Sequence, residues 1–116
     1  MKIGIIGQGY VGTAIKSGFE KYYELETYDK FNTSKSTVNL HDLVLLSDVI
    51  FVCVPTPMNV DGSCYIGIVE EVVSEVNEIS ISSESNPIVV LKSTVPPGTT
   101  DRLNKTYKGI SVIFNP

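Results

Sequence analysis

The sequence predicts an α/β fold: a doubly wound parallel sheet of five strands with four helices, in three α/β/α layers. Two observations predict this fold class. Short apolar segments alternate with segments whose apolar residues follow the helical period. The most apolar segment, residues 48–54, is apolar on both faces, which is typical of a parallel strand covered on both sides. The length of 116 residues suits one such domain, expected to span residues 1–116.

The first two strands and the first helix are expected at the beginning of the chain. Residues 2–6 are rich in isoleucine and end at Gly7, as short buried strands do. Apolar residues at helical spacing predict a helix over 10–22. Residues 24–28 then form the second strand.

The next part of the chain contains a loop, a short helix and the third strand. Residues 30–38 are polar and rich in Ser and Thr, which indicates a loop. Asn39 is a suitable cap for a helix over 40–46, with Asp42 three residues further on as in a capping box. The third strand covers 48–54.

A loop over 55–64, with a turn at Asp61-Gly62, precedes the third helix. Valines at helical spacing predict that helix over 65–80, followed by a polar connection up to Pro87. Its glutamates are expected on a solvated outer face: Glu70, Glu71, Glu75 and Glu78.

The last part of the chain is expected to hold two strands and a helix. Residues 88–91 form the fourth strand, and Pro96-Pro97-Gly98 precedes a helix over 99–107. The fifth strand covers 110–114. This alternation predicts right-handed crossovers and a parallel sheet. The last strand would leave an unpaired edge, so self-association into homo-oligomers is expected.

Composition excludes several classes of function. The formal net charge is −4, from 9 Lys and Arg against 13 Asp and Glu, without a basic run, which excludes nucleic acid as the main partner. No apolar stretch reaches the roughly 20 residues that span a bilayer, so no membrane partner and a cytoplasmic location are expected. Cys53 and Cys64 are expected as free thiols, and with the single His41 they are too few for a metal site.

A glycine-rich motif, Gly7-Gln8-Gly9-Tyr10-Val11-Gly12, has the form G-x-G-x-x-G. It follows a predicted strand, begins a predicted helix, and precedes an acid, Asp29, 22 residues after Gly7 at the end of the next strand. These three conditions together are typical of a Rossmann-type dinucleotide-binding turn. A turn with a purely geometric role is the less favoured alternative.

Each residue of the motif has a physical role in this hypothesis. Gly7 permits the tight turn, Gly9 lets the backbone approach a pyrophosphate, and Gly12 lets the helix pack near the strand. The N–H groups around Tyr10 and Val11 face the phosphates, and the helix dipole adds to the attraction.

Asp29 decides which dinucleotide is expected. Its carboxylate can accept hydrogen bonds from the adenosine ribose hydroxyls and repels a 2′-phosphate, so NAD is expected rather than NADP. Lys30, directly after it, is a cation that works against this preference.

Together with two later motifs, this motif makes the whole chain resemble the N-terminal NAD-binding domain of the UDP-glucose/GDP-mannose dehydrogenase family. The later motifs are Val54-Pro55-Thr56-Pro57 and Lys92-Ser93-Thr94-Val95-Pro96-Pro97-Gly98-Thr99-Thr100. Phe114-Asn115-Pro116 is similar to the start of that family's Asn-Pro-Glu segment. Both later motifs follow predicted strands, at the carboxyl edge where open α/β sheets bind ligands.

The resemblance implies that NAD contacts four residues: Val11, Asp29, Thr56 and Thr94. It also implies that Thr94 lies near the reacting carbon and helps hold a catalytic water. Val54 and Pro55 belong to the stiff segment that presents Thr56. Ser93 and Thr94 are also suited to capping the last helix, and for Thr56 and Thr94 considered singly such a local role would be favoured. As members of the two motifs, Thr56 and Thr94 are expected to line the cofactor.

The resemblance further implies a lysine that contacts the adenosine end of the cofactor. In the family this lysine lies a few residues beyond the ribose-binding acid. Lys35 is the nearest candidate, although its spacing in the loop does not match cleanly.

Enzymes of the resembling family oxidise the 6-hydroxymethyl group of a nucleotide sugar to a carboxylate with two NAD+, through a thiohemiacetal and a thioester on a catalytic cysteine. That cysteine, the dimer helix and the nucleotide-sugar pocket have no counterpart in this sequence. The chain is therefore expected to be truncated relative to the family and inactive alone. It is expected to bind a nucleotide sugar only if the missing C-terminal part is present. Cys53 and Cys64 are not expected to substitute, because no base accompanies them.

Two other interpretations stay open. The chain could be a stand-alone NAD-binding module without catalytic activity. It could also belong to another dehydrogenase with this cofactor domain, such as a 6-phosphogluconate or hydroxyacyl type, although these do not usually show the two proline-containing motifs.

Overall fold

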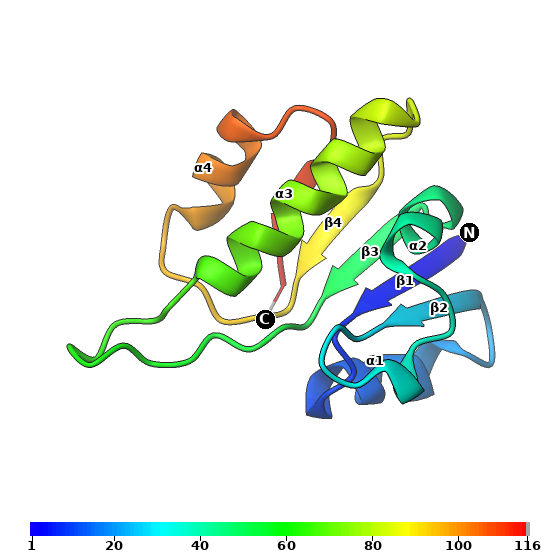
Figure 1. Cartoon of the computed structure of the whole chain (residues 1–116), viewed down its shortest axis with the longest axis horizontal. Helices are drawn as coiled ribbons and strands as arrows, with labels where there is room; N and C mark the ends of the chain where they lie inside the picture. Colours follow the sequence, from blue (N-terminus) through cyan, green and yellow to red (C-terminus); the bar gives the residue numbers. More distant parts are fainter. Residues whose placement is uncertain (116) are drawn as a thin grey trace.

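The computed structural model describes residues 1–115 and forms one five-stranded parallel sheet of order β2-β1-β3-β4-β5 (Figure 1). The strands are β1 (Lys2–Ile6), β2 (Glu24–Tyr28), β3 (Val49–Val52), β4 (Ile88–Leu91) and β5 (Ser111–Phe114). The helices are α1 (Tyr10–Phe19), α2 (Leu40–Leu46), α3 (Gly67–Ser82) and α4 (Thr99–Thr106), with a 3-10 turn over Thr33–Lys35. The predicted fold class and the alternating order of elements are confirmed.

The sheet is doubly wound because β2 and β3 lie on opposite sides of β1. Right-handed crossovers then place α1 on one face and the other three helices on the opposite face. The packing agrees: Phe19 of α1 stacks on Phe51 of β3, with ring centroids 5.8 Å apart. Ile50 and Val52 flank Phe51 and point to the other face, where they join the core with α2, α3 and α4.

The core of the domain lies under α3, which crosses in front of β4 in Figure 1. Val69, Val73 and Val76 of this helix are fully buried. Valine has only a modest intrinsic helix propensity, so burial of this face is what stabilises the helix. The spacing of the valines in the sequence was therefore the correct signal.

Two elements are each three residues shorter than predicted. The helix expected over 10–22 ends at Phe19, because the N–H groups of Tyr22 and Tyr23 turn back to the Phe19 carbonyl at 2.9 and 3.0 Å and the chain reverses into β2. The strand expected over 48–54 is shorter because it begins at Val49 and ends at Val52.

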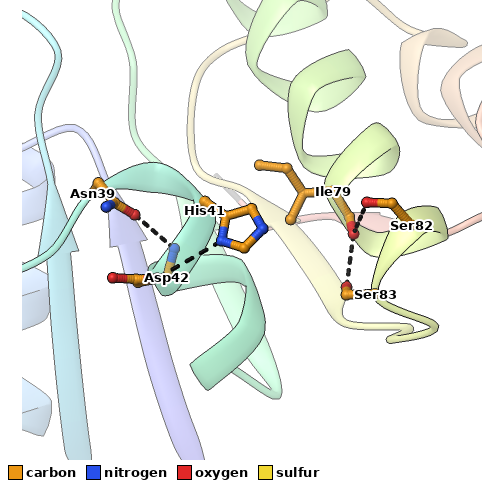
Figure 2. A network of polar contacts seen from close by, with 6 residues as sticks. All are labelled: Asn39, His41, Asp42, Ile79, Ser82 and Ser83. Carbon is orange, nitrogen blue, oxygen red and sulfur yellow. Dashed lines mark hydrogen bonds and ion pairs between the residues drawn. The ribbon is translucent and has the colours of Figure 1, made fainter.

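The third helix begins and ends two residues later than predicted, at Gly67 and Ser82. The hydroxyls of Ser82 and Ser83 donate to the Ile79 carbonyl at 3.1 and 2.7 Å (Figure 2). These bonds satisfy a carbonyl of the last turn, so serines expected in a connection extend the helix instead.

Two local signals in the sequence are confirmed. Asn39 caps α2, since its side-chain oxygen accepts a 2.8 Å hydrogen bond from the Asp42 N–H (Figure 2). Gly62 has a φ of +91° in the expected turn. The Ser63 hydroxyl and N–H both donate to the Asp61 carboxylate and lower its pKa.

Strand β5 is an edge of the sheet and pairs with β4 within the described residues 1–115. Its outer side is partly covered. The Asn104 side-chain amide donates to the Val112 carbonyl and accepts from the Val112 N–H, both at 2.8 Å. Asn104 thus pairs with β5 as a neighbouring strand would, which shortens the edge open to another chain.

The buried hydroxyl of Ser47 provides a test of the packing between α2 and β1. It has no hydrogen-bond partner among the described residues and lies against Gly4. A buried polar group without a partner destabilises the fold. We expect Ser47→Ala to leave the free energy of unfolding unchanged or to raise it by up to about 1 kcal/mol in urea denaturation.

Ser93→Ala is the matched control for this substitution. Ser93 is also buried, but its hydroxyl donates to the Val54 carbonyl at 2.7 Å. Its loss should lower the free energy of unfolding by about 1 kcal/mol. Equal destabilisation by the two substitutions would contradict this account of Ser47.

Candidate cofactor-binding site

A cleft with a volume of about 340 Å³ opens at the carboxyl ends of β1, β2 and β3. Its position follows from the topology. The chain leaves β1 toward α1 on one face and leaves β3 toward α3 on the other, so a crevice forms between the two diverging connections. Six of the residues predicted to bind the cofactor line this cleft: Gly7, Gly9, Asp29, Lys35, Val54 and Pro55.

The glycines of the motif fit tightly at two positions and leave open space at the third. Gly7 has a φ of +96°, and a Cβ there would stand 2.5 Å from the Cys53 carbonyl oxygen of the neighbouring strand connection. A Cβ on Gly12 would collide with the Gly7 carbonyl. A Cβ on Gly9 would meet nothing within 4 Å, so its backbone faces open space beside the cleft.

The first turn of α1 has the character of an anion site. The helix begins at Tyr10, its N-cap Gly9 provides no side-chain cap, and its first turn contains no acidic residue. Its first N–H groups, around Tyr10 and Val11, are therefore available to a phosphate. The Tyr10 side chain is 95% exposed and does not line the cleft.

Asp29 joins the glycine-rich turn to the end of β2. One carboxylate oxygen accepts from the Gln8 N–H at 2.8 Å, and the other accepts from the Phe31 and Asn32 N–H groups at 2.9 and 3.0 Å. A carboxylate has about four acceptor positions, so Asp29 can still accept from a ribose hydroxyl.

Lys35 reaches the same side of the cleft although its spacing in the sequence was unusual. Its ammonium group donates to the Gln8 carbonyl at 3.3 Å. The following loop folds back along the free edge of β2. There the Ser36 hydroxyl accepts from the Asp29 N–H and the Thr37 hydroxyl accepts from the Thr27 N–H, both at 2.8 Å. This return of the chain, which the spacing did not reveal, brings Lys35 to the glycine-rich turn.

The two proline-containing motifs meet at the ends of β3 and β4. Ser93 supports Val54 through the hydrogen bond described above. The interpretation of Ser93 and Thr94 as helix caps is wrong, because α4 begins only at Thr99 with Gly98 at its N-cap. Thr94 is exposed, and neither it nor the half-buried Thr56 lines the cleft.

The face of α3 contributes residues that sequence reasoning missed. The ammonium of Lys30 lies 3.3 Å from the Glu71 carboxylate, across the cleft that both residues line. Glu75 also lines the cleft, and Glu70 forms an ion pair with Arg102 of α4. The interpretation of Glu70, Glu71 and Glu75 as a merely solvated face is therefore wrong, whereas Glu78 is exposed as expected. Glu71 and Glu75 lie four residues apart, as do Ile68 and Val72, so all four fall on one side of the helix. This spacing was the signal in the sequence that the two glutamates share a face with apolar residues.

The two cysteines are free, as expected. Cys53 lines the cleft, and burial raises the pKa of its thiol to about 12, an effect that the nearby Lys92 opposes more weakly. The thiol is therefore protonated at neutral pH and is a poor nucleophile. Cys64 is half-buried in a short hairpin opposite Met58.

The crevice lies where doubly wound sheets bind nucleotides, and the start of α1 stands there beside the Asp29 carboxylate. This combination suits a ligand with both phosphate and ribose groups. The chain is in the class of dinucleotide-binding domains.

Comparison with known proteins identifies the family. The family described as "UDP-glucose/GDP-mannose dehydrogenase family, NAD binding domain" matches residues 25–116. The chain belongs to this family as an NAD-binding domain. Its glycine-rich motif lies before the matched residues, and the structure joins the motif to them through Asp29.

Relatives and solved structures agree with this membership. The chain is 31% identical over 102 residues to the GDP-mannose 6-dehydrogenase of Pseudomonas aeruginosa, covering 88% of the chain and 23% of that protein. It is 27% identical over 128 residues to the UDP-glucose 6-dehydrogenase AglM of Haloferax volcanii, covering 86% and 30%. A crystal structure of a ternary complex of GDP-mannose dehydrogenase from Pseudomonas aeruginosa has a TM-score of 0.82 and 25% identity, covering 100% of this chain and 36% of that one.

The chain spans a small part of these proteins. It covers 8% to 30% of the length of the four relatives that it matches. Within the described residues 1–115, no helix has the length and apolar character that a bilayer crossing requires.

Proposed function

We propose that the cleft holds the adenosine half of NAD and that the pyrophosphate lies at the first turn of α1. The single observation that carries this proposal is the arrangement at the switch point. There the uncapped helix start and the open backbone of Gly9 stand beside Asp29, which the Gln8 N–H fixes in place. The apolar side chains of Tyr28, Leu40 and Val72 line the same cleft and suit an adenine ring.

We propose further that the nicotinamide end extends along the carboxyl ends of β3 and β4. Val54 and Pro55 line the cleft, Thr56 follows them, and Thr94 lies beyond β4 at the same edge of the sheet. Bound NAD+ supplies a hydride acceptor for the oxidation of an alcohol. The residues of this chain bind and orient that acceptor, and Thr94 is proposed to hold a water at the reacting end.

For the whole protein, we propose a nucleotide-sugar 6-dehydrogenase of the UDP-glucose type, of which this chain, residues 1–116, is a single NAD-binding domain without catalytic turnover of its own. The names of the relatives and the short span of the chain support this proposal. The protonated Cys53 also supports it, because a thiohemiacetal requires a thiolate nucleophile. A location in the cytoplasm is consistent with two free thiols.

A titration tests the proposed site directly. We expect isothermal calorimetry to show NAD+ and NADH binding to the chain, with NADP+ and NADPH binding more weakly because Asp29 faces the 2′ position. The same chain with UDP-glucose and NAD+ should form no NADH. Absent or equal binding of the two dinucleotides would contradict the site, and NADH formation would contradict the lack of turnover. If the chain binds NAD and the protein it comes from contains no further domain, the alternative of a stand-alone NAD-binding module would be favoured over a dehydrogenase.

We also propose that the remaining edge of β5 supports homo-oligomers. Ile113 and Phe114 at this edge are 51% and 42% exposed. Light scattering at high concentration should detect dimers or larger species. A monodisperse monomer would contradict this proposal.

A further inference from the structure

The cleft is lined by a cation, Lys30, in addition to Asp29. Lys30 directly follows Asp29, the residue expected at the ribose hydroxyls. In sites that accept NADP, a cation near this position neutralises the additional phosphate. A sequence with Asp29 and Lys30 side by side therefore contains opposing signals for cofactor choice.

The structure shows how Lys30 is engaged. Its ammonium group does not pair with Asp29, whose carboxylate accepts hydrogen bonds from three backbone N–H groups. It donates instead to the Glu71 carboxylate of α3 at 3.3 Å, and the two side chains are 60% and 57% exposed. The pair links residues 41 positions apart in the chain, so the fold and not local sequence brings them together.

We propose that Glu71 is a specificity-determining residue that keeps the site selective for NAD, an inference that rests on the proposed function. Glu71 acts through Lys30. It neutralises the one cation next to the ribose-binding acid and adds a second carboxylate facing the place of a 2′-phosphate. A phosphate that entered would have to displace Glu71 from Lys30 and lie close to its negative charge.

The charges that line the cleft agree with this role. Three carboxylates, Asp29, Glu71 and Glu75, face two ammonium groups, Lys30 and Lys35, so the lining carries a net charge of −1. Lys35 does not replace Lys30, because its ammonium group is directed to the Gln8 carbonyl of the glycine-rich turn. Removing the Glu71 charge brings the net charge of the lining residues to zero and leaves the Lys30 ammonium group without its ion pair.

The test compares NAD+ and NADP+ affinities by calorimetry in the chain and in Glu71→Gln. We expect the ratio of NADP+ affinity to NAD+ affinity to rise about fivefold, the size that an exposed ion pair allows. Adenosine 2′,5′-bisphosphate against 5′-AMP should show the same change without a nicotinamide group. An unchanged ratio in the Glu71→Gln variant would overturn the proposal.

Two controls separate the ion pair from a general effect of charge. Glu75→Gln removes a carboxylate from the same helix face without breaking the pair, and its ratio should stay within about twofold of the wild type. In a Lys30→Met background, Glu71→Gln should raise the ratio by less than about twofold, because only the direct repulsion between Glu71 and the phosphate is then lost. A similar rise in either control would overturn the role of the pair. If the wild type binds neither dinucleotide, the proposed function itself fails. If the wild type binds NAD but Glu71→Gln leaves the affinity ratio unchanged, only the role of Glu71 fails.

Discussion

Replacing Gly12 by alanine should lower the free energy of unfolding by about 3 kcal/mol and lower NAD affinity more than about a hundredfold. The added Cβ would collide with the backbone carbonyl of Gly7, which cannot move aside as a flexible side chain could. Relief requires α1 to shift away from β1. That shift would displace the N–H groups of the first turn from the phosphate position. Urea denaturation and an NAD titration at low temperature would measure the two effects.

Two other glycines of this segment are controls for the same substitution. Gly9→Ala meets nothing within 4 Å, so stability should change by less than about 0.5 kcal/mol while NAD affinity falls, because the new methyl group occupies the pyrophosphate approach. Gly18→Ala, within α1 and equally unobstructed, should raise stability by about 0.5–1 kcal/mol. A Gly12→Ala variant as stable as the wild type would contradict the close approach of helix and strand.

The features that the sequence predicted correctly depend on neighbouring residues. The Asn39 cap and the Asp61-Gly62 turn each involve residues within a few positions of one another, and each formed as expected. The glycine-rich motif and Asp29 were also recognisable, because their spacing is a consequence of one strand, one helix and the next strand.

The features that sequence reasoning missed depend on how distant segments meet. Glu71 looked like part of a solvated helix face, because nothing in its own segment shows that Lys30 lies opposite. Ser93 was considered as a helix cap, but its hydroxyl donates to the Val54 carbonyl, a contact that depends on how the segments after β3 and β4 meet. Lys35 was placed at the adenosine end only through the family resemblance, and its contact with Gln8 required the loop to return along β2.

Asp29→Ala is the second substitution with a large expected effect. It removes the acceptor of three backbone N–H groups, from Gln8, Phe31 and Asn32, and leaves the glycine-rich turn detached from the end of β2. We expect the free energy of unfolding to fall by about 2–4 kcal/mol, because bonds to a charged acceptor are worth about 1.5–3 kcal/mol each and are not additive. NAD affinity should fall about a hundredfold or more, since the ribose also loses its acceptor.

Asp48→Ala is the matched control, because Asp48 also accepts a backbone hydrogen bond, from the Lys2 N–H at 2.9 Å, but lies before β3 at the opposite end of the sheet. It should cost about 1 kcal/mol or less and leave NAD affinity unchanged. Asp29→Asn separates geometry from charge: its remaining oxygen can keep part of the turn in place, while the lost charge removes the repulsion of a 2′-phosphate. Asp29→Ala and Asp48→Ala each remove a carboxylate that accepts from the backbone, but at opposite ends of the sheet. If the two variants bound NAD equally well, the Asp29 carboxylate would not face the ribose.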